Sequence, residues 1–152
     1  MRTFESLDAL VAAKGEVLGT SSWVEITQDA VNLFADATGD HQWIHVDVEK
    51  AKAGPFGGTI AHGFMTLSLI PRLMHEMYTV GGIKLAINYG LNKVRFPSPV
   101  PVGSKVRATS TLVDAEDVGN NTVQLTVSTV IEIEGAGKPA CVAESVLRYI
   151  GG

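Results

Sequence analysis

The chain has 152 residues, of which 45% are hydrophobic and 18% charged, with a formal net charge of -4. This length and apolar content predict a single globular domain, residues 1–152, with its own core. The scattered basic residues exclude a broad nucleic-acid-binding surface, and the single cysteine, Cys141, excludes an internal disulfide framework.

The N-terminal segment predicts a short helix. Leu7, Leu10 and Val11 fall on one helical face, and Gly15 follows as a stop signal. Charged residues interrupt the first 17 positions, so no secretion signal or membrane span is expected there. We therefore expect a soluble, cytoplasmic protein that has no membrane partner.

An edge strand and a capped helix are predicted next. Residues 22–26 have the composition of a strand, and Thr27 can cap a helix over residues 28–37. Gly39 suits the left-handed position that ends such a helix. The predicted inward face consists of Val31, Phe34 and Ala35.

Residues 41–59 are predicted to be an irregular loop of functional length, rich in glycine and proline at its end. The most apolar helical stretch follows at residues 62–77. It is apolar on more than one face, so we expect it to be buried. Pro71 should kink this helix or redirect its second half.

Everything after Gly82 predicts strand, interrupted by glycine-rich turns. The expected strands are residues 84–95, 104–114, 122–134 and 139–150. Helices followed by consecutive strands indicate an α+β fold, in which a long antiparallel sheet wraps around one central apolar helix.

The residues with the clearest chemistry are Asp40 and His45, a carboxylate and an imidazole just past a predicted helix end. Such a pair is suited to proton transfer, although an exposed loop carboxylate and a hydrogen-bonded histidine are the plainer alternatives. His41 and His45 are also four residues apart, a metal-ligand spacing that works only on a helix. Because Gly39 ends the helix before them, we expect no metal.

Three segments together resemble the MaoC-like dehydratases, the (R)-specific enoyl-CoA hydratase group of the hot-dog fold. They are residues 39–45, residues 61–65 at the start of the apolar helix, and residues 94–100. The chain departs from the family in having Gln42-Trp43 where members usually carry Asn-Pro. Pro71 lies close to a position where some members place a serine, and Ser68 is the weaker candidate for that role.

The resemblance implies hydration of trans-2-enoyl-CoA to (3R)-hydroxyacyl-CoA, with one water held between Asp40 and His45. The Gly63 N–H can meet the thioester oxygen as an oxyanion hole, or Gly63 can serve close packing alone. His62 is either part of the site or a capping and packing residue. Gln42 is a candidate for site support, and Arg95 a candidate for contact with the coenzyme A phosphates. No cofactor is expected, because coenzyme A belongs to the substrate.

Two other functions are compatible with the predicted fold. A hot-dog thioesterase would need a carboxylate on the central helix, where Glu76 is the only acid and lies near the far end. A non-catalytic acyl-CoA-binding partner subunit would not need both Asp40 and His45. We also expect a homodimer, because an unpaired sheet edge and a widely apolar helix both need a partner surface.

Overall fold

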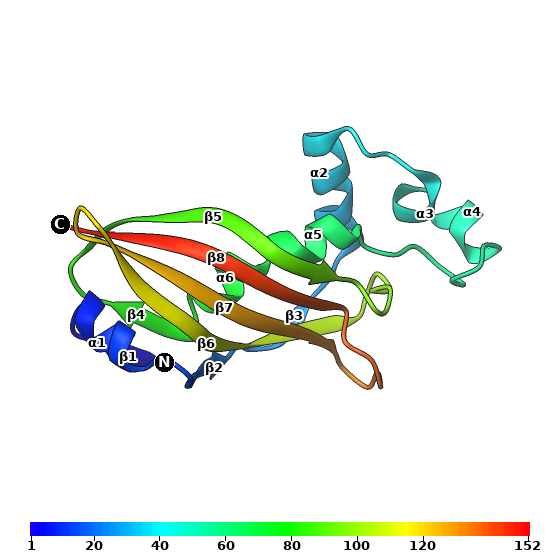
Figure 1. Cartoon of the computed structure of the whole chain (residues 1–152). Helices are drawn as coiled ribbons and strands as arrows, with labels where there is room; N and C mark the ends of the chain where they lie inside the picture. Colours follow the sequence, from blue (N-terminus) through cyan, green and yellow to red (C-terminus); the bar gives the residue numbers. More distant parts are fainter.

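The computed structural model describes residues 1–152 as one long antiparallel sheet with helices packed along it (Figure 1). Helices α2 (Gln28–Thr38), α3 (Trp43–Val46) and α4 (Val48–Lys52) gather at one end of the sheet, and α1 (Leu7–Ala12) lies at the other end (Figure 1). A core cluster of 27 buried residues fills the molecule. No helix is long and apolar enough to cross a membrane.

The main sheet has the strand order β2-β6-β7-β8-β5, in which β2 is Val17–Thr20, and the short β3 (Val24–Glu25) also pairs with β6. All of these pairings are antiparallel, as predicted. Four long strands confirm the four predicted ones: β5 (Ile83–Arg95), β6 (Lys105–Gly119), β7 (Thr122–Ile133) and β8 (Cys141–Gly151). Strand β5 lies at the edge of the sheet, so one of its sides has no strand partner.

The hairpin between β6 and β7 follows from its sequence. Buried and half-buried side chains alternate along β7, as a strand with one face on the core requires. Gly119, Asn120 and Asn121 all adopt positive φ angles at the turn, a conformation that glycine and asparagine tolerate best.

Helix α2 (Gln28–Thr38) forms as predicted. The Thr27 side chain accepts a hydrogen bond from the Ala30 N–H at 3.1 Å, which caps the first turn. Gly39 ends the helix with φ 81° and donates its N–H to the Ala35 carbonyl. Val31 and Ala35 are fully buried, and Phe34 is partly buried against the core.

The prediction of an irregular loop over residues 41–59 was wrong. This segment contains α3 (Trp43–Val46) and α4 (Val48–Lys52), and Asp47 caps α4 through the Lys50 N–H at 3.0 Å. Helices of four and five residues are too short to show a helical periodicity in the sequence.

The predicted central helix is divided in two. Helix α5 (Gly63–Ser68) and helix α6 (Ile70–Met74) meet at Leu69. Pro71 lies in the first turn of α6, where a backbone N–H would have no partner within the helix, so the missing N–H of proline breaks no hydrogen bond there. The division near Pro71 was predicted. Complete burial was not correct: Met65 and Leu73 are buried, but Phe64 is 70% exposed.

The remaining elements are short. Helix α1 (Leu7–Ala12) confirms the predicted N-terminal helix. Of the strand predicted at residues 22–26, only the two residues of β3 (Val24–Glu25) form a strand. The sequence did not indicate β1 (Arg2–Phe4), β2 (Val17–Thr20) or β4 (Tyr78–Val80). Strands β1 and β4 form a separate parallel pair.

Candidate active site

Asp40 is the first residue beyond the glycine that ends α2, and its side chain is 53% exposed. Its Oδ1 accepts a hydrogen bond from the Gln42 N–H at 3.4 Å, which orients the carboxylate locally. The carboxylate therefore faces solvent while its backbone is anchored to a helix end.

His45 lies on the short helix α3 and is buried. Its Nδ1 is 2.7 Å from the carbonyl oxygen of Ile60. A carbonyl only accepts, so Nδ1 carries the proton in the neutral ring and Nε2 keeps its lone pair. A second backbone bond, from the Ile60 N–H to the Ile44 carbonyl, holds the same two segments together. The imidazole is thus set up with a free basic nitrogen.

His62 precedes the first residue of α5 and is only 3% exposed. Its Nε2 donates to the carbonyl oxygen of Asp40 at 2.9 Å. Its ring stacks on His45 with centroids 3.8 Å apart, and Phe34 packs on it at 4.8 Å. Its Nδ1 is buried and makes no hydrogen bond. His62 does not cap α5 with its side chain.

The structure brings the predicted pair together and adds a third member. A carboxylate oxygen of Asp40 and one ring nitrogen each of His45 and His62 all lie within 4.8 Å of one another. A water molecule hydrogen-bonded to two of these groups fits such a spacing. The arrangement offers acceptors for a water proton beside the N-terminus of α5, which begins at Gly63.

His41 is not part of this group, which overturns the metal-ligand alternative built on His41 and His45. Its Nε2 bonds Asp36 Oδ1 at 3.0 Å on the surface. This hydrogen bond raises the pKa of His41 above its ordinary value.

Sequence analysis missed Gln28, which clamps the site loop from the first turn of α2. Its Nε2 donates to the His45 carbonyl at 2.8 Å, and its Oε1 accepts from the Thr59 hydroxyl at 2.6 Å. The partners are 17 and 31 residues away, so nothing local in the sequence could have indicated the contact.

Gly63 serves close packing and also keeps a free donor. A Cβ at this position would lie 3.0 Å from the ring of Phe96, closer than ordinary contact. Its N–H makes no hydrogen bond to another backbone group, as expected for the first residue of a helix. Both alternatives considered for Gly63 are therefore compatible with the structure.

Gln42 and Arg95 are less firmly tied to the site. Gln42 contacts Asp40 through its backbone, and its exposed side chain forms no hydrogen bond. The exposed guanidinium of Arg95 donates to the carbonyl of Val94 at 2.7 Å, at the end of β5. Neither side chain joins the group formed by Asp40, His45 and His62.

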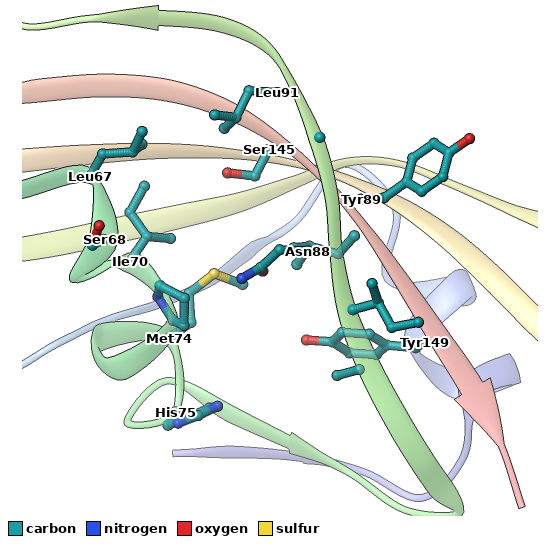
Figure 2. A pocket seen from close by; sticks show the side chains of 15 residues that line it. Leu67, Ser68, Ile70, Met74, His75, Asn88, Tyr89, Leu91, Ser145 and Tyr149 are labelled. Carbon is teal, nitrogen blue, oxygen red and sulfur yellow. The ribbon is translucent and has the colours of Figure 1, made fainter. Parts of the chain in front are cut away.

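A cavity of about 570 Å³ runs between the helix pair α5–α6 and strands β5 and β8 (Figure 2). Ser68 and Pro71, the two positions relevant to the family's serine, both line it. The Ser68 hydroxyl donates to the Phe64 carbonyl at 2.7 Å.

Comparisons with known proteins agree with this architecture. The family model described as "MaoC like domain" matches residues 10–134. The 3-hydroxyacyl-thioester dehydratase Z of Mycobacterium tuberculosis (strain ATCC 25618 / H37Rv) is 75% identical over 150 residues, covering 99% of both chains. Nodulation protein N of Rhizobium leguminosarum bv. viciae is 44% identical over 131 residues, covering 85% of this chain and 81% of the relative.

Solved structures show the same fold. The (R)-hydratase from A. caviae, involved in PHA biosynthesis, superposes with a TM-score of 0.72 at 25% identity, covering 88% of this chain and 94% of that chain. A monoamine oxidase regulatory protein from Archaeoglobus fulgius gives a TM-score of 0.78 at 25% identity, covering 99% and 98%. The predicted α+β hot-dog fold is confirmed.

Proposed function

Since the chain belongs to the MaoC-like dehydratase family, we propose that it is an (R)-specific enoyl-CoA hydratase, a hydro-lyase that adds water reversibly to trans-2-enoyl-CoA. The product is (3R)-hydroxyacyl-CoA. The observation that carries this proposal is the convergence of Asp40 and His45, whose Nδ1 is bound to the Ile60 carbonyl, beside the start of α5. The resemblance noted in the sequence is confirmed by the family match.

In the proposed reaction, a water molecule hydrogen-bonds to the Asp40 carboxylate and to His45 Nε2. His45 accepts a proton as the hydroxyl group adds to C3 of the enoyl thioester. The electrons of the double bond move onto the thioester oxygen, and the proton taken from the water is then delivered to C2. Addition of both parts from one face gives the (3R) product.

The enolate oxygen that forms between these steps needs a hydrogen-bond donor. The free N–H of Gly63 supplies one in our proposal, because it points from the first turn of a helix and has no partner within the chain. We assign Arg95 to the coenzyme A phosphates, since it is exposed at the end of β5 next to Phe96, which packs over Gly63. Gln42 supports the loop through its N–H to Asp40.

Substitution of the two acid–base residues tests this mechanism. Asp40→Asn and His45→Gln should each lower kcat for crotonyl-CoA by at least about a hundredfold, far more than they raise KM. The double variant should be little worse than either single one, because the pair handles one water as a unit. His41→Gln is the matched control, since His41 adjoins Asp40 in the chain but its ring bonds Asp36 at the surface. Near-normal hydration by both Asp40→Asn and His45→Gln would refute the assignment.

We further propose that the reaction uses no metal or redox cofactor. The rings of His45 and His62 are stacked, with an interplanar angle of 22° and centroids 3.8 Å apart, so the ring planes that contain their nitrogen lone pairs do not meet near the rings. Two imidazoles on one zinc ion must instead converge on a point about 2.0–2.1 Å from each nitrogen. Activity should survive exhaustive chelation. Stoichiometric zinc in the purified protein, with activity lost on its removal, would contradict the proposal.

The thioesterase alternative is disfavoured by the position of Glu76. This carboxylate follows α6 and accepts two hydrogen bonds from Ser22, so it braces the chain and does not face Asp40 and His45. A non-catalytic partner subunit is disfavoured because the acid–base pair is assembled.

We propose that two copies form a homodimer in the cytoplasm through β5. Four apolar side chains along this edge strand are between 40% and 57% exposed: Leu85, Ile87, Tyr89 and Leu91. Single protein chains rarely leave such an edge uncovered, and a second copy pairing with β5 would extend the sheet. The acyl-CoA tunnel would then be lined by both chains.

A further inference from the structure

The cavity beside the helix pair is suited to an acyl chain. Figure 2 shows Leu67, Ile70 and Met74 of the helices on one side, and strand β5 with Tyr149 of β8 on the other. Most of its lining residues are hydrophobic. In the same view the ring of Tyr89 points away from the helices (Figure 2).

The cavity continues one face of α5 away from the catalytic group. Residues four apart lie on the same side of a helix, so Gly63 and Phe64 share a face with Leu67 and Ser68. The ring of Phe64 packs edge-on against Phe96 at 6.1 Å, and Phe96 in turn covers Gly63. If the thioester lies at Gly63, as the proposed function requires, its acyl chain runs along this face into the cavity.

At its far end the cavity has a partition of side chains that also line a neighbouring cavity. A second cavity of about 320 Å³ lies beyond, and the two share four lining residues: Met74, His75, Ala86 and Tyr149. Tyr149 is the largest of the four. Its hydroxyl is 2.6 Å from the hydroxyl of Tyr78, which lines only the second cavity.

Tyr149 is held firmly in this partition. Its partner Tyr78 is 6% exposed and packs edge-to-face on Phe4 at 6.1 Å. Burial raises the pKa of Tyr78 and of Tyr149 above the ordinary tyrosine value, so both phenols stay protonated at neutral pH and share one hydrogen bond. Moving Tyr149 aside would leave a buried hydroxyl unpaired, which disfavours the open arrangement by a factor of roughly 5 to 150.

We propose that the hydrogen-bonded pair Tyr149–Tyr78 is the end wall of the acyl pocket and sets the longest acyl chain that the enzyme accepts. This inference rests on the proposed function and names the substrate class within it. Gly63 and Met74 are at most roughly 16 Å apart along the helix pair at 1.5 Å per residue, because the two helices are not one straight rod. An extended chain advances about 1.2 Å per bond, so the wall stands on the order of a dozen carbons from the thioester. Below this limit, each buried methylene should improve kcat/KM by up to about fourfold.

The test is the chain-length profile of trans-2-enoyl-CoA substrates from crotonyl-CoA to hexadecenoyl-CoA. The quantity compared is the ratio of kcat/KM for tetradecenoyl-CoA to that for crotonyl-CoA within each variant, so that changes in overall activity cancel. Tyr149→Ala removes the ring and should raise this ratio at least about tenfold, the gain expected from fewer than two newly buried methylenes. Tyr149→Phe keeps the ring and should leave the longest accepted chain within two carbons of that of the unaltered enzyme.

Tyr78→Phe removes the hydrogen bond but not the wall, and should raise the ratio less than Tyr149→Ala does. If Tyr149→Ala does not fold, Tyr149→Leu provides a smaller opening with an apolar side chain. An unchanged ratio in a folded Tyr149→Ala or Tyr149→Leu enzyme that still hydrates crotonyl-CoA would overturn the end wall alone.

Failure of the unaltered enzyme on every enoyl-CoA would overturn the proposed function. The wall would then be tested by calorimetric binding of saturated acyl-CoA chains, with the same length shift expected in Tyr149→Ala and an unchanged length limit refuting it.

Discussion

His62 joins the acid–base pair without touching the reacting atoms in the proposed mechanism. Its Nε2–H holds the Asp40 carbonyl, and its ring supports the ring of His45. In that mechanism His62 would act as a positioning residue, because a catalytic carboxylate displaced by about 1 Å can lose on the order of a hundredfold in rate. Sequence analysis considered His62 for the site or for a capping or packing role; the structure excludes the side-chain cap and shows the ring packed against His45 and Phe34.

Replacement of His62 separates positioning from packing. His62→Phe keeps an aromatic ring between His45 and Phe34 but removes the donor to Asp40. We expect kcat to fall by roughly tenfold to a hundredfold with a smaller change in KM. His62→Gln, which can present an N–H to the same carbonyl, should recover part of the loss. Unchanged kcat in a folded His62→Phe enzyme would show that the contact has no role in catalysis.

At the scale of elements, the end of α6 is tied to the start of β3 by one carboxylate. Oε2 of Glu76 accepts from the Ser22 hydroxyl at 2.7 Å and from the Ser22 N–H at 2.8 Å. The side-chain hydrogen bond, and then the backbone one, lowers the pKa of Glu76 below its ordinary value of 4.5. The folded state therefore favours the charged form.

This coupling predicts a pH-dependent stability. A carboxyl whose pKa is lower in the folded state stabilises the fold above its ordinary pKa, and the contribution is lost as the pH falls through the folded pKa. Glu76→Gln should lower the urea midpoint at pH 7, and its difference from the unaltered protein should shrink below about pH 4.5. Glu49→Gln is the control, because Glu49 is exposed and pairs only with Lys52. A difference that stays constant from pH 7 to pH 3 would exclude the charge as the cause.

At the scale of the whole molecule, the exposed side of β5 is the surface through which we expect the chain to associate with a second copy. Its apolar side chains and unpaired backbone groups adjoin the cavity that we assign to the acyl chain. A second copy on this edge would bury both. Such a dimer would link catalysis and assembly through one strand.

We expect the active protein to have about twice the monomer mass of 16.1 kDa by light scattering, and its activity to fall on dilution below the dimer dissociation constant. Leu85→Glu combined with Tyr89→Glu should weaken the dimer, since like charges face one another across a two-fold pair of strands. In the unaltered protein the guanidinium of Arg148 lies over the Tyr89 ring, 3.8 Å from its centroid. The carboxylate introduced by Tyr89→Glu would lie near this guanidinium. Leu33→Glu, at an exposed position on α2, is the control. Full activity at the monomer mass would refute the homodimer.

The sequence by itself determined the long elements and indicated candidate site residues in the segment after α2. Alternating apolar residues fix which face of β7 is buried, because the strand period is two and a one-residue shift would expose the whole set. Thr27 and Gly39 mark both ends of α2 through local hydrogen bonds. Asp40 and His45 were selected through the family resemblance, which rests in part on the short segment of residues 39–45.

Only the tertiary structure decided what depends on distant partners. Strands of two to four residues, such as β2 and β4, carry too little periodicity to be read, and the parallel pairing of β1 with β4 joins opposite halves of the chain. The bond of His62 to Asp40 spans 22 residues, and that of Tyr78 to Tyr149 spans 71. Such contacts form where the packed core brings segments together, so no local pattern of residues specifies them.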